Sequence, residues 1–191
     1  MNSYSIIAVF LLANLMVGCA QPLHQATSIR YGDQCSEAEA AGRLDVAEQA
    51  CYRALVNVDW GHLGDEQRSM RMYNLARVKR RLGKYDEAEK LYKESLDIEE
   101  KLPQPSNEKI GRRLAELAIT YGAQEQYQIG LPYVERLYSL ADIYQGNEKN
   151  SVAGVFYAYS EELAKEQQSE LSAKLAAKSR EMGFDPKEFG R

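Results

Sequence analysis

The sequence has few of the residues that interrupt helices or that build metal and catalytic centres. Among its 191 residues there are five prolines and two histidines, His24 and His62, and runs of β-branched residues are absent beyond the first 20 positions. Two isolated histidines cannot form a His-x-x-x-His metal pair. The sequence also contains no Gly-x-Ser-x-Gly elbow and no phosphate-binding glycine loop. We therefore expect no enzymatic activity, no bound metal and no cofactor.

An excess of basic residues is also missing. Lys and Arg number 24 against 28 Asp and Glu, which gives a formal net charge of −4. Such a chain lacks the electrostatic footprint of a nucleic-acid-binding protein. Hydrophobic residues nonetheless make up 45% of the sequence, enough to form a core. Ala, Glu and Leu are the most frequent residues, and these residues lose little entropy in a helix. The composition predicts an all-α fold.

The N-terminus carries an apolar run from Ile6 to Val17, which is too short to span a bilayer comfortably. Residues 1–18 are predicted to be a secretory signal. Their end, with the sequence LMVGC, resembles the lipobox of bacterial lipoproteins, in which the cysteine after the cleavage site becomes acylated. The resemblance implies that Cys19 is lipidated, and three acyl chains would anchor it stably. The alternative is an ordinary signal with an incidental cysteine, because Met16 and the lack of Lys or Arg depart from the pattern.

The resemblance to lipoproteins also predicts a location. Ala20, rather than Asp, follows the cysteine, which implies release to the outer membrane of a Gram-negative bacterium, facing the periplasm. Residues 19–27 would then form the lipidated cysteine and a short tether.

The other two cysteines are suitably placed for a disulfide bond. Cys35 and Cys51 each lie eight residues from Arg43, the expected turn of a helical hairpin. Positions equidistant from a turn face each other across an antiparallel helix pair. In an exported protein such a bond would persist, and closing a loop of about 15 residues stabilises by ~3 kcal/mol. The alternative is two small buried thiols at the helix contact.

The stretch RRLGKYDEAEKLYKESLDIEEKL, residues 80–102, indicates the end of one helix, a Gly-Lys turn and a second amphipathic helix. Ala88, Tyr92 and Leu96 recur on one face of the second helix. Related patterns occur around residues 42, 124 and 166. The small residue that opens each second helix falls at Ala47, Ala88, Gly130 and Ser172, at intervals of 41, 42 and 42 residues. The chain is therefore predicted to stack four helical hairpins that share a continuous core.

The Gly-x-Tyr turn, the small-residue pairing and the apolar spacing resemble the tetratricopeptide repeat. The 42-residue period resembles the kinesin-light-chain subtype of that repeat. The resemblance covers residues 28–182 and is strongest in the second copy, whereas the fourth copy is expected to cap the array. It implies a right-handed superhelical array of antiparallel helix pairs, a TPR-like α-solenoid. Residues 183–191 are expected to form a C-terminal tail that packs loosely or frays.

In this family the first helix of each repeat presents side chains to a bound peptide. The resemblance places the groove residues at Met70, Tyr73, Asn74, Arg77, Arg80, Arg81, Arg112, Glu116, Ile119 and Tyr157. Seven Lys and Arg, and no Asp or Glu, occur from Arg68 to Lys84. Arginine and aromatic residues are enriched at protein-binding hot spots, and arginines would suit an acidic segment of a partner. The alternative is a solvated face that pairs with Glu87, Glu89 and Glu94 of the neighbouring helix.

These features favour an adaptor or scaffold in envelope assembly that binds a segment of a protein partner. By analogy of fold, the alternatives are a periplasmic inhibitor or immunity protein and a regulator of cell-wall enzymes. An inhibitor could use a rigid loop such as Trp60–Gly64. We expect Trp60 instead to fill the junction between the first and second hairpins; the alternative is that it is exposed as an anchor.

Overall fold

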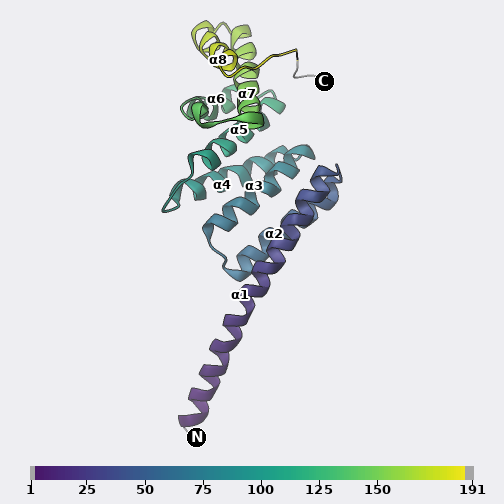
Figure 1. Cartoon of the computed structure of the whole chain (residues 1–191), viewed down its shortest axis with the longest axis vertical. Coiled ribbons are helices and arrows are strands. Elements are labelled where there is room, and N and C mark those ends of the chain that lie inside the picture. Colours follow the sequence, from purple (N-terminus) through teal and green to yellow (C-terminus); the bar gives the residue numbers. More distant parts are fainter. Residues whose placement is uncertain (1–2, 188–191) are drawn as a thin grey trace. The chain divides into compact units, whose positions relative to one another are not determined.

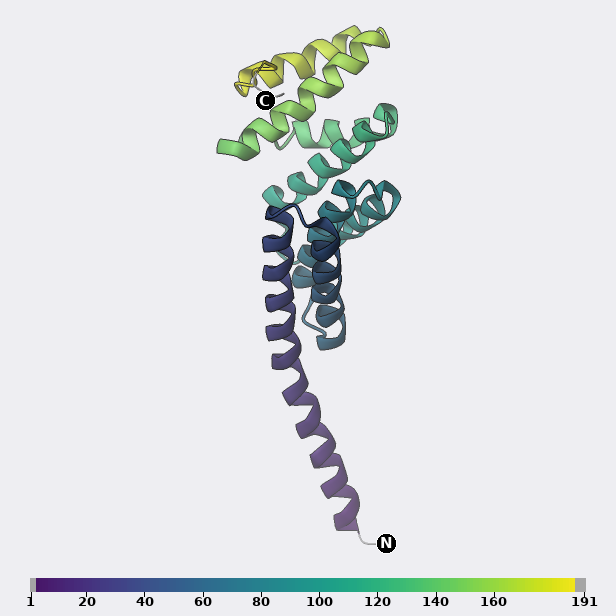
Figure 2. The ribbon, with the colours of Figure 1, turned by 90° about the vertical axis from the view of Figure 1, so that its right-hand side faces the viewer.

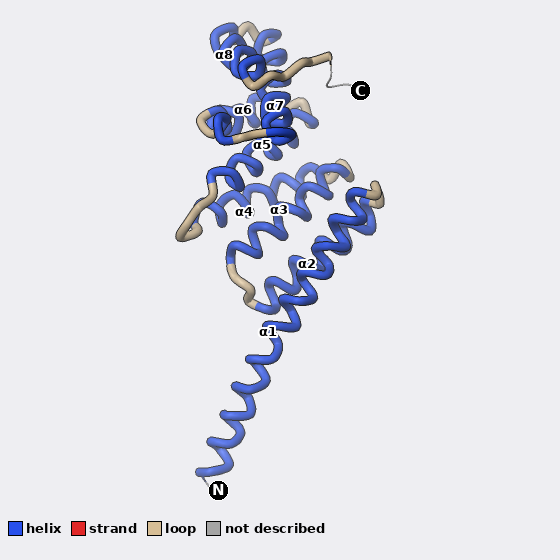
Figure 3. The backbone as a smooth tube through the Cα atoms, viewed as in Figure 1, coloured by secondary structure: helices blue, strands red, loops and turns tan. Residues whose placement is uncertain are grey.

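The structure is a computed structural model that describes the backbone of residues 3–187 and the side chains of residues 21–187. Within that range it contains eight α-helices, one short 3-10 helix (η1) and no strand (Figure 3), so the all-α prediction is confirmed. The elements are α1 (Ser3–Ala40), α2 (Leu44–Gly61), α3 (Asp65–Arg81), α4 (Tyr85–Lys101), α5 (Asn107–Ala123), α6 (Tyr127–Tyr138), η1 (Ala141–Ile143), α7 (Gly146–Lys165) and α8 (Ser169–Glu181). Positions 188–191 of the predicted tail lie outside the described residues.

The helices form four antiparallel pairs of the kind found in TPR-like arrays (Figure 1). The chain divides into two compact units, residues 1–98 and residues 99–191, with the boundary inside α4. Unit 1 holds the pair α1/α2, the helix α3 and most of α4. Unit 2 holds the pairs α5/α6 and α7/α8.

Serine hydroxyls link the helices of three pairs at equivalent positions. Ser28 donates to the carbonyl of Ala54 over 2.9 Å, and Ser69 donates to that of Ser95 over 2.8 Å. In the last pair the direction is reversed, because Ser179 of α8 donates to the carbonyl of Ala153 over 2.9 Å. The partners are 26 residues apart in every case. A small side chain at this position lets the helix backbones approach closely, and its hydroxyl finds a buried acceptor.

The turns between paired helices repeat the same backbone geometry. A residue with positive φ stands at Gly42, Gly83, Glu125 and Gln167, at intervals of 41, 42 and 42 residues. The next residue donates its N–H to a carbonyl five positions back, for example Lys84 to Lys79 over 2.9 Å. This is the Schellman arrangement that ends a helix in the left-handed region. The predicted repeat thus extends to the fourth pair, in which the sequence pattern is weakest.

The core of unit 1 surrounds a disulfide bond. Cys35 of α1 and Cys51 of α2 are joined, with their Cα atoms 5.1 Å apart, so the structure contains the bond that the spacing about Arg43 predicts. Both cysteines are buried beside Ala38, Ala47 and Ala50 and beside α3 residues Met72, Leu75 and Val78. The bond therefore ties the first hairpin together at the surface on which the second one packs.

Helix α1 includes the segment that was expected to be a tether. Figure 2 shows its second half alongside α2, while its first half extends past the end of that helix. Residues 21–27 are helical, and His24 of this segment lies 3.0 Å from Asn57 of α2, from Nδ1 to Oδ1. The side chain of Cys19, the predicted lipidation site, lies outside the described part. None of the described helices combines the length and apolarity needed to cross a bilayer.

Candidate functional site

The predicted groove residues of unit 1 lie on α3, with Met70 exposed in its first half and the others between its middle and its end. Tyr73, Asn74, Arg77 and Arg80 are half-buried, and Arg81 is exposed. Arg77 lies over the ring of Tyr73, 5.7 Å from its centroid, and Tyr73 packs at 5.8 Å against Tyr92 of α4. One face of α3 therefore carries an arginine and aromatic surface, as the spacing of these residues predicts.

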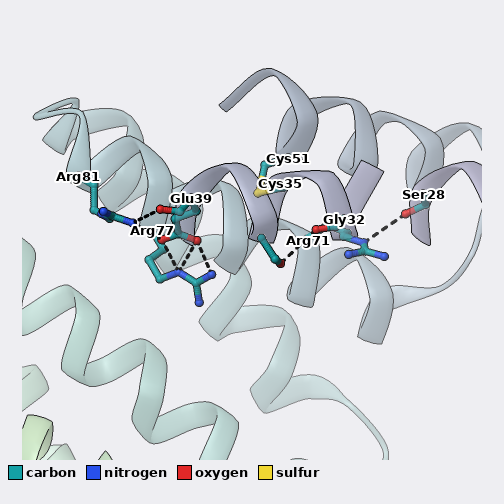
Figure 4. Close-up of a disulfide and its surroundings, with 9 residues drawn as sticks. Ser28, Gly32, Cys35, Glu39, Cys51, Arg71, Arg77 and Arg81 are labelled. Atoms are coloured by element: carbon teal, nitrogen blue, oxygen red, sulfur yellow. Dashed lines mark hydrogen bonds and ion pairs between the residues drawn. A yellow bond between two sulfur atoms is a disulfide. The ribbon is translucent and has the colours of Figure 1, made fainter. Parts of the chain in front are cut away.

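A carboxylate of the same chain faces this surface. Glu39, near the end of α1, accepts hydrogen bonds from Arg77 at 2.6, 3.0 and 3.2 Å. Arg81 approaches the same carboxylate at 3.2 Å and also donates to the backbone carbonyl of Glu39 (Figure 4). Burial alone would raise the pKa of Glu39, but the hydrogen bonds and charges of the two arginines outweigh it and lower the pKa below its usual value. The two arginines thus hold together the ends of α1 and α3.

The basic run on α3 pairs mainly with the first hairpin. Lys79 contacts Glu48 of α2 at 2.7 Å, and Lys84 contacts the same carboxylate at 2.6 Å. Of the carboxylates predicted as partners, Glu87 pairs with Lys79 at 2.5 Å, whereas Glu89 pairs with Lys93 on its own helix. The basic residues of α3 therefore do form ion pairs, but mostly with carboxylates of the preceding hairpin and not with those of the neighbouring helix α4. The sequence pattern within one hairpin carried no signal of this direction.

Arg71 is a buried residue of α3 that sequence reasoning missed. Its side chain crosses α1 at Gly32, where a Cβ atom would lie 1.9 Å from Nη1, and its Nε donates to Ser28 over 3.2 Å (Figure 4). Burial lowers the pKa of Arg71, partly offset by the charge of Asp33. Gly32 occupies the repeat position of Tyr73, Ala115 and Tyr157. The missing side chain at this position was the signal in the sequence that another side chain, here that of Arg71, fills the space.

Unit 2 presents a different surface, an apolar cavity of about 280 Å³. We call it the α5–α7 cavity. Its lining comes from α5, α7 and the first residue of α6: Ala118, Ile119, Gly122, Tyr127, Ser151, Gly154, Val155, Ala158 and Tyr159. The cavity exists because its glycine and alanine residues have little or no side chain, and Ile119 and Val155 give it an apolar wall. Of the predicted groove residues, Ile119 lines this cavity, whereas Arg112, Glu116 and Tyr157 do not.

These three residues make other contacts. Arg112 pairs with Glu108 on its own helix and with Glu148 of α7, the latter at 2.7 Å. Glu116 accepts a hydrogen bond at its backbone carbonyl from Thr120. Tyr157 packs against Phe184, with ring centroids 5.3 Å apart, so part of the predicted tail packs onto α7.

Tyr159 forms one wall of the α5–α7 cavity and explains a glycine in the repeat. Its hydroxyl donates to the carbonyl of Ala118 over 2.9 Å, and burial raises its pKa well above the usual value. A Cβ atom at Gly130 would lie 1.8 Å from this hydroxyl. The first two copies have Ala47 and Ala88 at the equivalent position, and their following helices have leucine where α7 has tyrosine. The larger aromatic ring therefore requires the smaller partner.

Comparison with known proteins agrees with this architecture. Residues 68–143 match the family model described as tetratricopeptide repeat. The fold resembles the crystal structure of a Podosopora anserina protein assigned as a kinesin light chain with nearly identical TPR-like repeats. The TM-score is 0.60 at 18% identity over 92% of this chain and 91% of that one. A single-residue variant of that protein gives a TM-score of 0.61 at 18% identity, with the same coverage of both chains.

A third structure is similar as well. BtubC (BKLC) from P. vanneervenii matches with a TM-score of 0.67 and 16% identity over 83% of this chain and 66% of that one. No curated protein matches the sequence. Residues 68–143 thus carry a match to the tetratricopeptide repeat, and the fold of the chain resembles kinesin-light-chain-like repeats. Repeats of this kind generally mediate protein–protein interaction and are typically non-catalytic scaffolds.

No group of histidine, cysteine and acidic side chains that could hold a metal occurs among the described residues.

Proposed function

We propose that the protein is a lipid-anchored adaptor, held at the outer membrane and facing the periplasm, that binds a segment of a protein partner during envelope assembly. The observation that carries the binding role is the α5–α7 cavity. It lies between the first helices of two successive pairs, the helices that present ligand contacts in tetratricopeptide repeats. Apolar walls and a few polar groups are typical of sites that accept a side chain.

The cavity favours an apolar anchor residue in the partner. Its lining of Ile119, Val155, two tyrosines and small residues carries no charged side chain. Its volume of about 280 Å³ exceeds the space that one large apolar side chain fills. Burying such a side chain supplies about 1.5–3 kcal/mol, so one anchor would contribute substantially to a transient complex.

Three features support the proposed location. The LMVGC sequence resembles a lipobox, and the disulfide bond is of a kind that persists in oxidising compartments. In addition, Pro22 lies inside α1. Proline destabilises a helix interior but is tolerated in the first turn, so cleavage before Cys19 would place Pro22 where its cost is small.

The binding role is tested by site-specific photo-crosslinking in living cells. A benzoylphenylalanine at Ala158, which lines the cavity, should form adducts with the partner, identified by mass spectrometry. The matched control is Ala173, an exposed alanine on α8 outside the cavity lining. Ala158→Phe should fill the cavity and abolish capture without lowering thermal stability, whereas Ala173→Phe should leave capture unchanged. Equal adducts from both positions would contradict the proposal.

A partner with an acidic segment would bind on α3 in competition with Glu39. Because Glu39 occupies Arg77 and Arg81, a foreign carboxylate must displace it. Glu39→Gln removes the competing charge and keeps both arginines. Partner capture should then strengthen if an acidic segment binds there, and it should stay unchanged if binding depends on the α5–α7 cavity alone. A pull-down with wild type and Glu39→Gln at equal expression distinguishes these cases.

A further inference from the structure

The two most exposed large apolar side chains in the described part of the chain both neighbour His24, one along the chain and one across the helix pair. Leu23 of α1 is 67% exposed and Trp60 of α2 is 69% exposed. The ring of His24 lies between their helices and packs edge-on against Trp60, with centroids 6.2 Å apart. We call Leu23, His24 and Trp60 the Leu23–Trp60 patch. The prediction that Trp60 fills the junction between hairpins is therefore wrong, because the ring points away from the core.

The patch is held rigidly by the first hairpin. Trp60 belongs to the last turn of α2, and His24 is fixed by its contact with Asn57 at 3.0 Å. Gly61 lets the two helices meet, because a Cβ atom there would lie 2.7 Å from the Cβ of His24. The indole is thus exposed on a helix rather than on a flexible loop. A surface that binds it therefore does not have to order the backbone, which would reduce the affinity.

The surroundings of the patch carry no excess of positive charge. Residues 20–29 contain no Asp, Glu, Lys or Arg. Asp59, next to Trp60, pairs with Arg68 at 2.9 Å. Beyond the following loop, α3 begins with Asp65 and Glu66, both exposed. Such a surface suits the uncharged or zwitterionic headgroup region of a bilayer better than an anionic one.

The position of the patch along the chain identifies its occupant. Leu23 lies four residues after Cys19, which is one helical turn or about 6 Å along the axis. A lipid on Cys19 would therefore bring the patch to the membrane surface. Tryptophan favours this region, because its ring is apolar and its N–H remains hydrogen-bonded. We infer that the Leu23–Trp60 patch inserts into the headgroup region of the bilayer and orients the repeats on it. This inference rests on the proposed lipid anchor.

The single tryptophan of the sequence makes the inference directly measurable. The protein as made by the cell is purified in detergent and reconstituted into phosphatidylcholine vesicles with or without brominated acyl chains. Trp60 emission should shift to shorter wavelength on reconstitution and should be quenched by the brominated lipid. The matched control is Trp60→Phe combined with Tyr52→Trp. Tyr52 is also exposed on α2, but lies eight residues or about 12 Å further from the anchor.

The control tryptophan should show little quenching. Equal emission of Trp60 in brominated and unbrominated vesicles would overturn the inference, and so would equal quenching at positions 52 and 60. The intact mass of the purified protein reports separately whether Cys19 carries lipid. Protein without lipid is coupled at Cys19, the thiol outside the disulfide bond, to a maleimide lipid before reconstitution. The quenching of Trp60 then tests the patch even if cellular lipidation fails.

Discussion

At the scale of single residues, Glu39 of α1 is the most consequential side chain among those that face the arginines of α3. Its carboxylate is nearly buried, at 9% side-chain exposure, and it is shared by Arg77 and Arg81. A carboxylate in this environment is stable only while its cationic partners remain, because a buried unpaired charge is costly. The arginines that suit a partner's carboxylate are therefore also structural residues.

Reversing both arginine charges should destabilise the protein. Arg77→Glu combined with Arg81→Glu would place three carboxylates together, and we expect a loss of about 2–4 kcal/mol in the free energy of unfolding. Urea denaturation followed by circular dichroism measures this loss. The control Arg43→Glu, at an exposed turn position, should change stability by less than about 0.5 kcal/mol. An unchanged midpoint in the double variant would show that the pairs with Glu39 contribute nothing.

The same residue predicts the pH dependence of stability. The folded state lowers the pKa of Glu39 below its ordinary value of 4.5, so its ion pairs stabilise the protein fully above that value. The contribution is lost as the pH falls through the folded-state pKa. Wild type should therefore lose more stability between pH 7 and pH 3 than Glu39→Gln does. Parallel unfolding curves for the two proteins across this range would contradict the assignment.

At the scale of elements, the turns differ in how well their residues suit the backbone. Gly42 and Gly83 adopt positive φ at no steric cost, whereas Glu125 and Gln167 adopt it with a Cβ atom. The first two hairpins thus have the residue that the Schellman turn favours. The last two hold the same geometry through packing of their helices.

Exchanging these residues should therefore have opposite effects. Glu125→Gly is expected to raise the free energy of unfolding by about 0.5–1 kcal/mol, and Gly83→Ala is expected to lower it by about 1 kcal/mol. Thermal unfolding of the two variants checks both signs. Glu125→Ala serves as the control, because it removes the charge but keeps the strained Cβ atom. A gain in Glu125→Ala equal to that in Glu125→Gly would show that charge, rather than backbone geometry, is responsible.

The elements also show where sequence reasoning succeeds. The register of Ala47, Ala88, Gly130 and Ser172 predicts the hairpins, because small residues at helix contacts recur with the repeat. The partners of the basic run were not predictable, since Glu39 and Glu48 reach α3 only through the stagger between successive hairpins. The α5–α7 cavity was also not predictable from the sequence, for a related reason. It is defined by side chains that are small, and small residues in a helix ordinarily indicate close packing.

At the scale of the whole molecule, stability in a repeat array is expected to be distributed locally, because each hairpin contacts its neighbours only. The disulfide lies at one end of the sequence, in the first hairpin, and closes a separation of 16 residues. Its contribution, of ~3 kcal/mol in the chain-entropy model, should therefore be felt mainly in unit 1.

Hydrogen exchange with and without reductant tests this locality. Reduction should weaken amide protection in α1 and α2 and leave α7 and α8 unchanged. The control Cys35→Ser combined with Cys51→Ser should already show the weakened pattern and should not respond to reductant. A uniform loss of protection through α8 would instead mean that the chain unfolds as one cooperative body.

The fit between Gly130 and Tyr159 bears on how such a chain can be rebuilt or can diverge. We expect hairpins with alanine and leucine at these two places to be interchangeable, whereas the third is matched to its successor. A gene duplication or a designed shuffle that moved the last hairpin elsewhere would set its tyrosine against an alanine methyl. Alanine with leucine and glycine with tyrosine should accordingly be inherited as matched sets among descendants of this sequence.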